Sequence, residues 1–149
     1  MRGILCFYFY KRAYGIDIES IKEIVEELPV TELFRTPTCL PGVTNLRGKI
    51  LAVINFAELF NLPKNGDYPN KRKFIVISEK GGKEAALIVD DIIEVKWLEE
   101  LAFQEAPDTI DENENKYLAN IIKTEKSPIP VIDVKKLLND EIWKNINMV

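Results

Sequence analysis

The chain has 149 residues and a net charge of −4, with acidic and basic residues mixed along it and no histidine. This length suits one domain with a buried core. The acidic balance argues against surfaces for nucleic acid or anionic membranes, which usually carry a basic excess. The lack of histidine excludes Ser-His-Asp and Cys-His catalytic arrangements and removes the commonest zinc ligand.

Cysteine usage and the start of the chain indicate the cellular compartment. Cys6 and Cys39 lack the spacing of a metal site; a disulfide between them is possible, but nothing demands one, so a reducing compartment fits better. The aromatic run at residues 4–10 is closed by Lys11 and Arg12, so we interpret it as a strand and not as a signal peptide. No apolar stretch is long enough to span a bilayer. We expect a cytoplasmic protein without direct membrane insertion.

The first sixty residues predict strands, turns and one short helix. In chain order we expect a strand at 5–10, an alternating strand at 14–18, a loop at 36–42, a strand at 49–55 and a helical turn at 56–60. Apolar side chains at residues 20–28 recur at helical spacing. Both a short helical turn and an irregular strand fit that segment.

The rest of the chain continues the pattern of short strands. The expected elements are a polar loop at 63–70, strands at 74–78 and 84–89 around a glycine-containing hairpin turn, a strand at 92–98, a mobile loop at 105–115, and strands at 117–123 and 129–132. Asp133 then predicts the cap of a helix, and Val134, Leu138, Ile142 and Ile146 would share one face of it. This order predicts a mostly β fold of small barrels.

Residues 41–55 carry a recognisable signature. They read Gly-Val-Thr-Asn-Leu-Arg-Gly at positions 42–48 and run on into an apolar strand, which resembles the core signature of the CheW chemotaxis coupling proteins. Further blocks resemble the family in the same order, at residues 14–18, 21–24, 87–95 and 129–138. Asn55 and Asn120 stand where the family has Asp and Gly. Because Asn tolerates left-handed backbone, we expect the turn at Asn120 to survive.

The resemblance implies a fold and a function. The fold is a single domain over residues 1–149 with two intertwined five-stranded SH3-like barrels, a short C-terminal helix and a hydrophobic groove between the barrels. The middle barrel would span roughly residues 51–95, and the N- and C-terminal strands would form the second. The function is a non-enzymatic adaptor between chemoreceptor cytoplasmic tips and the regulatory domain of the histidine kinase CheA. That regulatory domain is built like CheW, so we expect the middle barrel to contact it.

The resemblance also implies a receptor-binding groove. Its residues would be Ile21, Glu23, Gly42, Val43, Asn45, Arg47, Gly48 and Val89. A pair between Glu23 and Arg47 would fix the geometry of this surface, and a solvated turn arginine is the plainer alternative. The two glycines are either turn residues or points of close backbone approach. The three aliphatic residues are either core or groove lining.

A single-stranded nucleic-acid binder of OB-like architecture is the alternative function. Residues 7–12 and 70–74 place aromatic beside basic side chains, and such combinations can stack bases. The acidic net charge and the family resemblance both count against it.

The remaining chemical candidates are weak. Asp90, Asp91 and Asp133 fit turn and cap positions better than catalysis or magnesium binding. Trp97 and Trp143 are interpreted as packing residues. We therefore expect no catalytic residue, no metal and no cofactor, and no catalysis by the chain itself.

Overall fold

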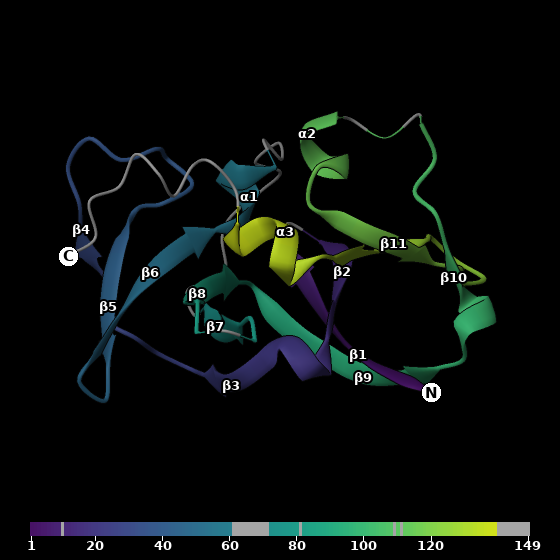
Figure 1. Cartoon of the computed structure of the whole chain (residues 1–149), viewed down its shortest axis with the longest axis horizontal. Coiled ribbons are helices and arrows are strands. Elements are labelled where there is room, and N and C mark those ends of the chain that lie inside the picture. Colours follow the sequence, from purple (N-terminus) through teal and green to yellow (C-terminus); the bar gives the residue numbers. More distant parts are fainter. Residues whose placement is uncertain (10, 61–71, 81, 109, 111, 140–149) are drawn as a thin grey trace.

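Two β-sheets of six strands each lie side by side in Figure 1. The computed structural model describes residues 1–9, 11–60, 72–80, 82–108, 110 and 112–139. The sheet on the left, the middle sheet, has the strand order β3-β7-β8-β6-β5-β4. Its strands are β3 (Ile21–Val25), β4 (Thr31–Glu32), β5 (Gly42–Leu46), β6 (Lys49–Asn55), β7 (Lys73–Ser78) and β8 (Glu84–Val89).

The sheet on the right combines the two ends of the chain, and we call it the end-strand sheet. Its order is β10-β11-β12-β2-β1-β9. Its strands are β1 (Arg2–Phe9), β2 (Arg12–Asp17), β9 (Asp91–Leu98), β10 (Phe103–Gln104), β11 (Leu118–Ile122) and β12 (Ile129–Ile132). In both sheets, two antiparallel hairpins meet through one parallel pair, β8 with β6 and β12 with β2. The sheets thus share one plan, although no sequence repeat is obvious.

Short helices connect the strands. They are the 3₁₀ turns η1 (Ile18–Ser20) and η2 (Glu100–Ala102) and the helices α1 (Phe56–Leu59), α2 (Glu112–Asn115) and α3 (Val134–Leu138). The side chain of Asn55 accepts hydrogen bonds from the backbone of Ala57 and Glu58, so it caps α1. The predicted cap of α3 is confirmed, because Asp133 accepts from the N–H of Lys136. Ile142, Trp143 and Ile146 lie outside the described residues.

Several predicted elements are confirmed, and some change. The apolar strand at 49–55 coincides with β6, and the hairpin at 74–78 and 84–89 is β7 with β8. The ambiguous segment at 20–28 is a strand, β3, because it pairs with β7 with a bulge after Ile21. The predicted loop at 105–115 contains α2, and the loop at 63–70 lies outside the described residues. Asn120 lies inside β11 beside a bulge, so the expected turn there is wrong.

The boundaries predicted for the middle barrel need correction. The middle sheet begins at Ile21 and ends at Val89, whereas the prediction placed it at 51–95. The N–H of Asp90 donates to the carbonyl of Tyr8 at 3.0 Å, which directs the chain onto β1. From there β9 pairs with β1 as far as Arg2 opposite Leu98, so residues 91–98 belong to the end-strand sheet.

Aromatic side chains join the two sheets at the centre of the molecule. Phe56 packs against Tyr14 and Phe60 with ring centroids 4.7 and 4.3 Å away, and against Phe7 and Phe9 at 5.7 and 5.5 Å. Edge-on and tilted contacts at these distances are favourable for aromatic pairs. The same buried cluster includes aliphatic residues of both sheets, such as Leu5, Ile16, Ile54, Ile75 and Leu87. One core therefore serves both sheets.

Candidate functional site

The signature residues form a tight hairpin turn between β5 and β6. Leu46 pairs with Lys49, and the two residues between them, Arg47 and Gly48, have positive φ values of 51° and 86°. Positive φ at both central positions is what a type I′ turn requires. The side chain of Asn45 accepts a hydrogen bond from the N–H of Gly48 at 2.8 Å. Asn45 and Gly48 therefore hold the turn that presents Arg47.

Arg47 and Glu23 form a two-point ion pair. The Arg47 guanidinium donates from Nη1 to Glu23 Oε2 at 2.6 Å and from Nη2 to Oε1 at 2.9 Å. The Arg47 side chain is 73% exposed and that of Glu23 is 22% exposed. The hydrogen bonds from Arg47 lower the pKa of the Glu23 carboxyl, and the bonds to Glu23 raise the pKa of Arg47. The predicted pair is confirmed, and it ties β3 to the hairpin turn.

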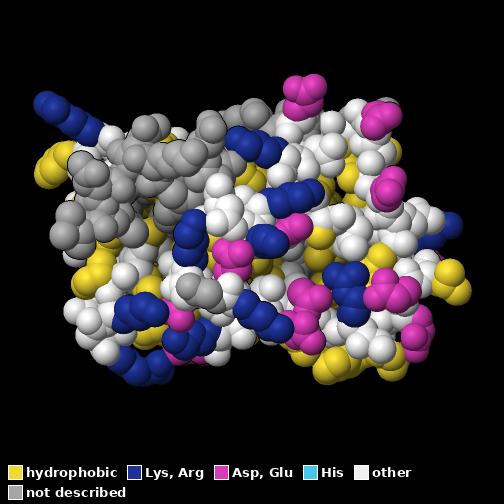
Figure 2. Space-filling model, in the orientation of Figure 1, with side chains coloured by type: hydrophobic (Ala, Val, Ile, Leu, Met, Phe, Trp, Pro, Cys, Tyr) yellow, Lys and Arg dark blue, Asp and Glu magenta, His cyan; other side chains and the backbone are white. Residues whose placement is uncertain are grey.

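A second ion-pair system joins β3 and β6 to β8 and was not predicted. Glu84, at the start of β8, accepts from Lys22 Nζ at 2.8 Å and from Lys49 Nζ at 2.8 Å. These contacts lower the pKa of the Glu84 carboxyl. We call the five residues Lys22, Glu23, Arg47, Lys49 and Glu84 the charged cluster. Figure 2 shows basic side chains gathered around acidic ones at the lower left, where β3 meets the hairpin.

Gly42 and Val89 do not offer a surface to a partner. Gly42 is buried in β5, and a side chain there would overlap the carbonyl group of Thr31, because an added Cβ would lie only 2.8 Å from its carbonyl carbon. The close approach expected at this glycine is real, but the neighbour is the chain's own β4. Val89 is fully buried in the central core, so its assignment to groove lining is corrected.

The other aliphatic candidates lie between core and surface. Ile21 and Val43 are half-buried, and Ile21 packs against the central core. Gly48 is different from Gly42, because a Cβ added there would meet nothing within 4 Å. Two exposed apolar side chains that the prediction missed, Ile24 and Ile50, lie on β3 and β6. Their places after Glu23 and Lys49 were visible in the sequence, but their exposure was not.

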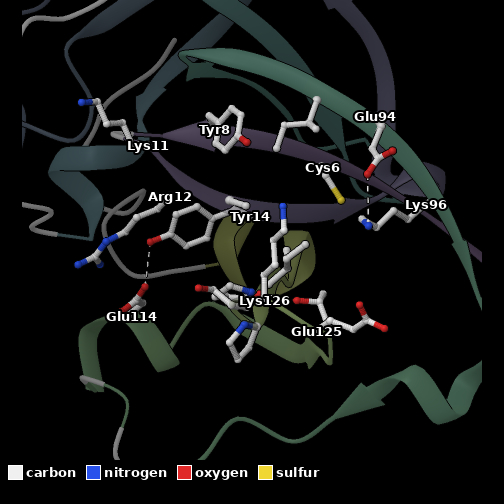
Figure 3. Close-up of a pocket in the computed structure, with 17 residues that line it drawn as sticks. Cys6, Tyr8, Lys11, Arg12, Tyr14, Glu94, Lys96, Glu114, Glu125 and Lys126 are labelled. Atoms are coloured by element: carbon white, nitrogen blue, oxygen red, sulfur yellow. Dashed lines mark hydrogen bonds and ion pairs between the residues drawn. The ribbon is translucent and has the colours of Figure 1, made fainter.

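A cavity of about 800 Å³ opens on the end-strand sheet (Figure 3). Basic and acidic residues share its wall, and several of them pair with one another. Lys96 Nζ lies 3.3 Å from Glu94 Oε1, and the Tyr14 hydroxyl donates to Glu114 at 3.0 Å. Burial raises the pKa of the Cys6 thiol, which opposes thiolate formation. The wall therefore carries charged groups of both signs.

Neither a metal-binding cluster nor a membrane-spanning helix occurs in the described part of the chain. Its His, Cys, Asp and Glu residues form no group of three or more that could hold a metal ion. None of its helices has the length and apolarity needed to cross a bilayer.

Residues 3–141 match the family described as CheW-like domain. The chain belongs to this CheW-like family. It is 28% identical over 137 residues to the chemotaxis protein CheW of Klebsiella aerogenes, a match that covers 92% of this chain and 81% of that protein. It is 27% identical over 150 residues to the chemotaxis protein CheW of Treponema pallidum, covering 97% and 87%.

A solved structure supports the same assignment. The crystal structure of the scaffolding protein TtCheW from Thermoanaerobacter tengcongensis superimposes with a TM-score of 0.77 and 32% sequence identity, covering 88% of this chain and 83% of that one. The predicted fold class of two SH3-like barrels is thereby confirmed, with six strands in each sheet in place of five.

Family membership decides between the two predicted functions. The chain is a chemotaxis coupling adaptor of the CheW family. The nucleic-acid alternative finds no support, because the rings of Phe7 and Phe9 are fully buried in the core and Phe74 is also buried. Buried rings cannot stack on bases, so these three rings serve packing; Tyr8 is exposed, and Tyr10 lies outside the described residues.

Proposed function

We propose that this adaptor binds the cytoplasmic tip of a chemoreceptor on the face formed by β3 and the β5–β6 hairpin. The observation that carries the proposal is the two-point pair of Arg47 with Glu23, which orients the hairpin turn relative to β3. A second part of the middle sheet binds the regulatory domain of the kinase CheA. The protein acts in the cytoplasm as a scaffold and catalyses no reaction itself.

The proposed receptor face has the chemistry that an amphipathic helix needs. Ile24 and Ile50, which follow Glu23 and Lys49 in sequence, expose apolar surface, and a helix can bury its own apolar face against such side chains. The open space above Gly48 lets a helix approach the turn closely. The surrounding charges orient the partner more than they add affinity.

Removing either member of the ion pair is expected to weaken receptor binding. Arg47→Ala and Glu23→Ala should each reduce affinity for a receptor-tip fragment by roughly tenfold, the effect of an interface residue that contributes substantially. The double variant should lose less binding free energy than the sum of the two single variants, because each single substitution already breaks the same ion pair. Titration calorimetry gives the affinities. Thermal melting should change little, because Arg47 is largely exposed.

Lys126→Ala is the matched control for this double-mutant cycle. Lys126 is an exposed basic residue in the turn between β11 and β12, remote from the middle sheet. Its loss should leave receptor binding unchanged. Additive losses of affinity for Arg47→Ala and Glu23→Ala would show that the two residues act independently. An equal loss for Lys126→Ala would show that receptor binding depends only on general electrostatic attraction, and not on this site.

The kinase contact is expected on the middle sheet, away from the charged cluster. Phe34, in the loop after β4, has a 93% exposed side chain, and exposed aromatic residues are frequent anchors at protein interfaces. An NMR titration of the labelled adaptor with the CheA regulatory domain should shift amide signals within residues 21–89, including Phe34. Shifts confined to residues 1–20 and α3 would contradict this assignment.

A further inference from the structure

Strand β9 leaves one edge of the end-strand sheet open. It pairs with β1 on one side, and among the described residues no strand pairs with its other side. An open edge presents backbone N–H and C=O groups that can pair with another strand. β9 also exposes Ile93, Val95 and Trp97. Figure 2 shows hydrophobic side chains along the lower right edge, where Figure 1 places β9.

The interpretation of Trp97 as a packing residue needs correction. Its ring lies over Gly3, where an added Cβ would be 2.9 Å from the ring atom Cζ3, yet the residue is 57% exposed. One side of the indole is therefore held against β1 while the remainder faces solvent. A large, positioned and exposed aromatic residue on an open strand is well suited to anchor a partner.

The charge pattern of β9 indicates the kind of partner strand that can pair with it. Glu94 and Lys96 lie on the same side of the strand, with Glu94 Oε1 and Lys96 Nζ 3.3 Å apart (Figure 3). In an antiparallel pair, directly opposite residues share a face of the sheet. If a second β9 runs antiparallel with Val95 opposite Val95, each Glu94 lies opposite a Lys96 of the other copy. The strand is therefore complementary in charge to itself.

We propose that two copies of this chain associate through β9, antiparallel, about a two-fold axis at Val95. The open edges pair their backbones, and the two Glu94–Lys96 pairs select this register. A shift by two residues in either direction removes those pairs. The bulge in the β1–β9 ladder falls between Ile92 and Glu94, which keeps the regular part of the strand short. Trp97 of each copy then covers the bulged end of the other strand.

The association is expected to be weak, since interfaces smaller than about 1,200 Å² are typically transient. It gains strength where adaptors are already held side by side, because the effective concentration is then high. It does not depend on the proposed receptor and kinase sites, which lie on the other sheet. All three contacts can form at once.

Cross-linking tests the register directly. In the proposed dimer the two Val95 Cα atoms lie about 4.5–5.5 Å apart, which a disulfide can span. Val95→Cys should therefore form a covalent dimer under mild oxidation. Leu101→Cys, in the exposed η2 turn, is the control and should not, and the native Cys6 and Cys39 are buried. Equal cross-linking of the two variants, or none at Val95→Cys, would overturn the proposal.

Charge reversal tests the selection of the partner. In the Val95→Cys background, Glu94→Lys and Lys96→Glu should each cut self-cross-linking by roughly tenfold at low salt, because like charges then face each other. A mixture of the two variants should cross-link at the original rate, and so should the chain that carries both changes. Both side chains are at least one-third exposed, so the fold tolerates these changes. Single variants that self-associate as well as the mixture would contradict the two-fold register.

Discussion

Replacing Phe56 by alanine is expected to lower the free energy of unfolding by about 3–5 kcal/mol, the usual cost of removing a buried phenylalanine. Phe56 is fully buried and contacts rings from β1, from β2 and from Phe60 at the end of α1. Truncation removes apolar burial and leaves a cavity between the two sheets. The surrounding rings come from different elements, so they cannot all move inward together to fill it.

Phe34→Ala is the matched control for Phe56→Ala. The chemical change is the same, but the Phe34 side chain is 93% exposed, so its loss should fall within about 0.5 kcal/mol of zero. Urea unfolding with linear extrapolation measures both variants. Because one core serves both sheets, Phe56→Ala should also keep a single transition. A loss comparable to that of Phe34→Ala, or two separate transitions, would show that the sheets are stabilised independently.

Replacing Gly42 by alanine is expected to cost about 3 kcal/mol, at the upper end of the range for overpacking. The added methyl would overlap the carbonyl group of Thr31, which is backbone and cannot rotate away. Thr31 pairs with Val43 and Glu32 pairs with Gly42, so relief requires β4 to separate from β5. Hydrogen exchange should therefore speed up across residues 29–33 in this variant.

Gly48→Ala is the control that distinguishes the cost of steric overlap at position 42 from the general cost of replacing a glycine. Gly48 has a positive φ of 86° but open space around its Cα, so alanine there meets only the backbone preference, about 1 kcal/mol. Thermal and urea unfolding should rank Gly42→Ala as clearly worse than Gly48→Ala. Equal losses of unfolding free energy at the two positions would mean that β4 moves away from β5 at little cost, and that the overlap with Thr31 does not restrict position 42.

Local elements and the signature turn could be predicted from the sequence, because their causes are local. Residues 49–55 form a dense apolar run, so β6 has the expected bounds, and the helical turn predicted at 56–60 begins as expected at Phe56, after its cap Asn55, and ends one residue earlier, at Leu59. The Glu23–Arg47 pair was predicted from the family resemblance and not from composition. Without the resemblance, a solvated turn arginine was a plain alternative for Arg47.

Long-range pairings could not be predicted in this way. β9 follows β8 directly in sequence, yet it pairs with β1 near the start of the chain, and nothing in its own pattern indicates that partner. Lys22 and Glu84 are 62 residues apart, so their ion pair was not visible before the fold was known. At Gly42 the sequence indicated a close approach of backbone, but only the structure identified the neighbour as Thr31.

The interleaving of the two sheets along the chain has a consequence for folding. The middle sheet uses only residues 21–89, so all of its strands are synthesised before β10, β11 and β12. β1 and β2 are synthesised before the middle sheet, but Gly15 and Ile16 of β2 pair with Val131 and Ile132 of β12, which are synthesised after it. Contacts between residues so distant in sequence form slowly. During synthesis, the β1–β2 hairpin therefore keeps an unpaired edge after all strands of the middle sheet have been made, and that edge is the surface that a chaperone would protect.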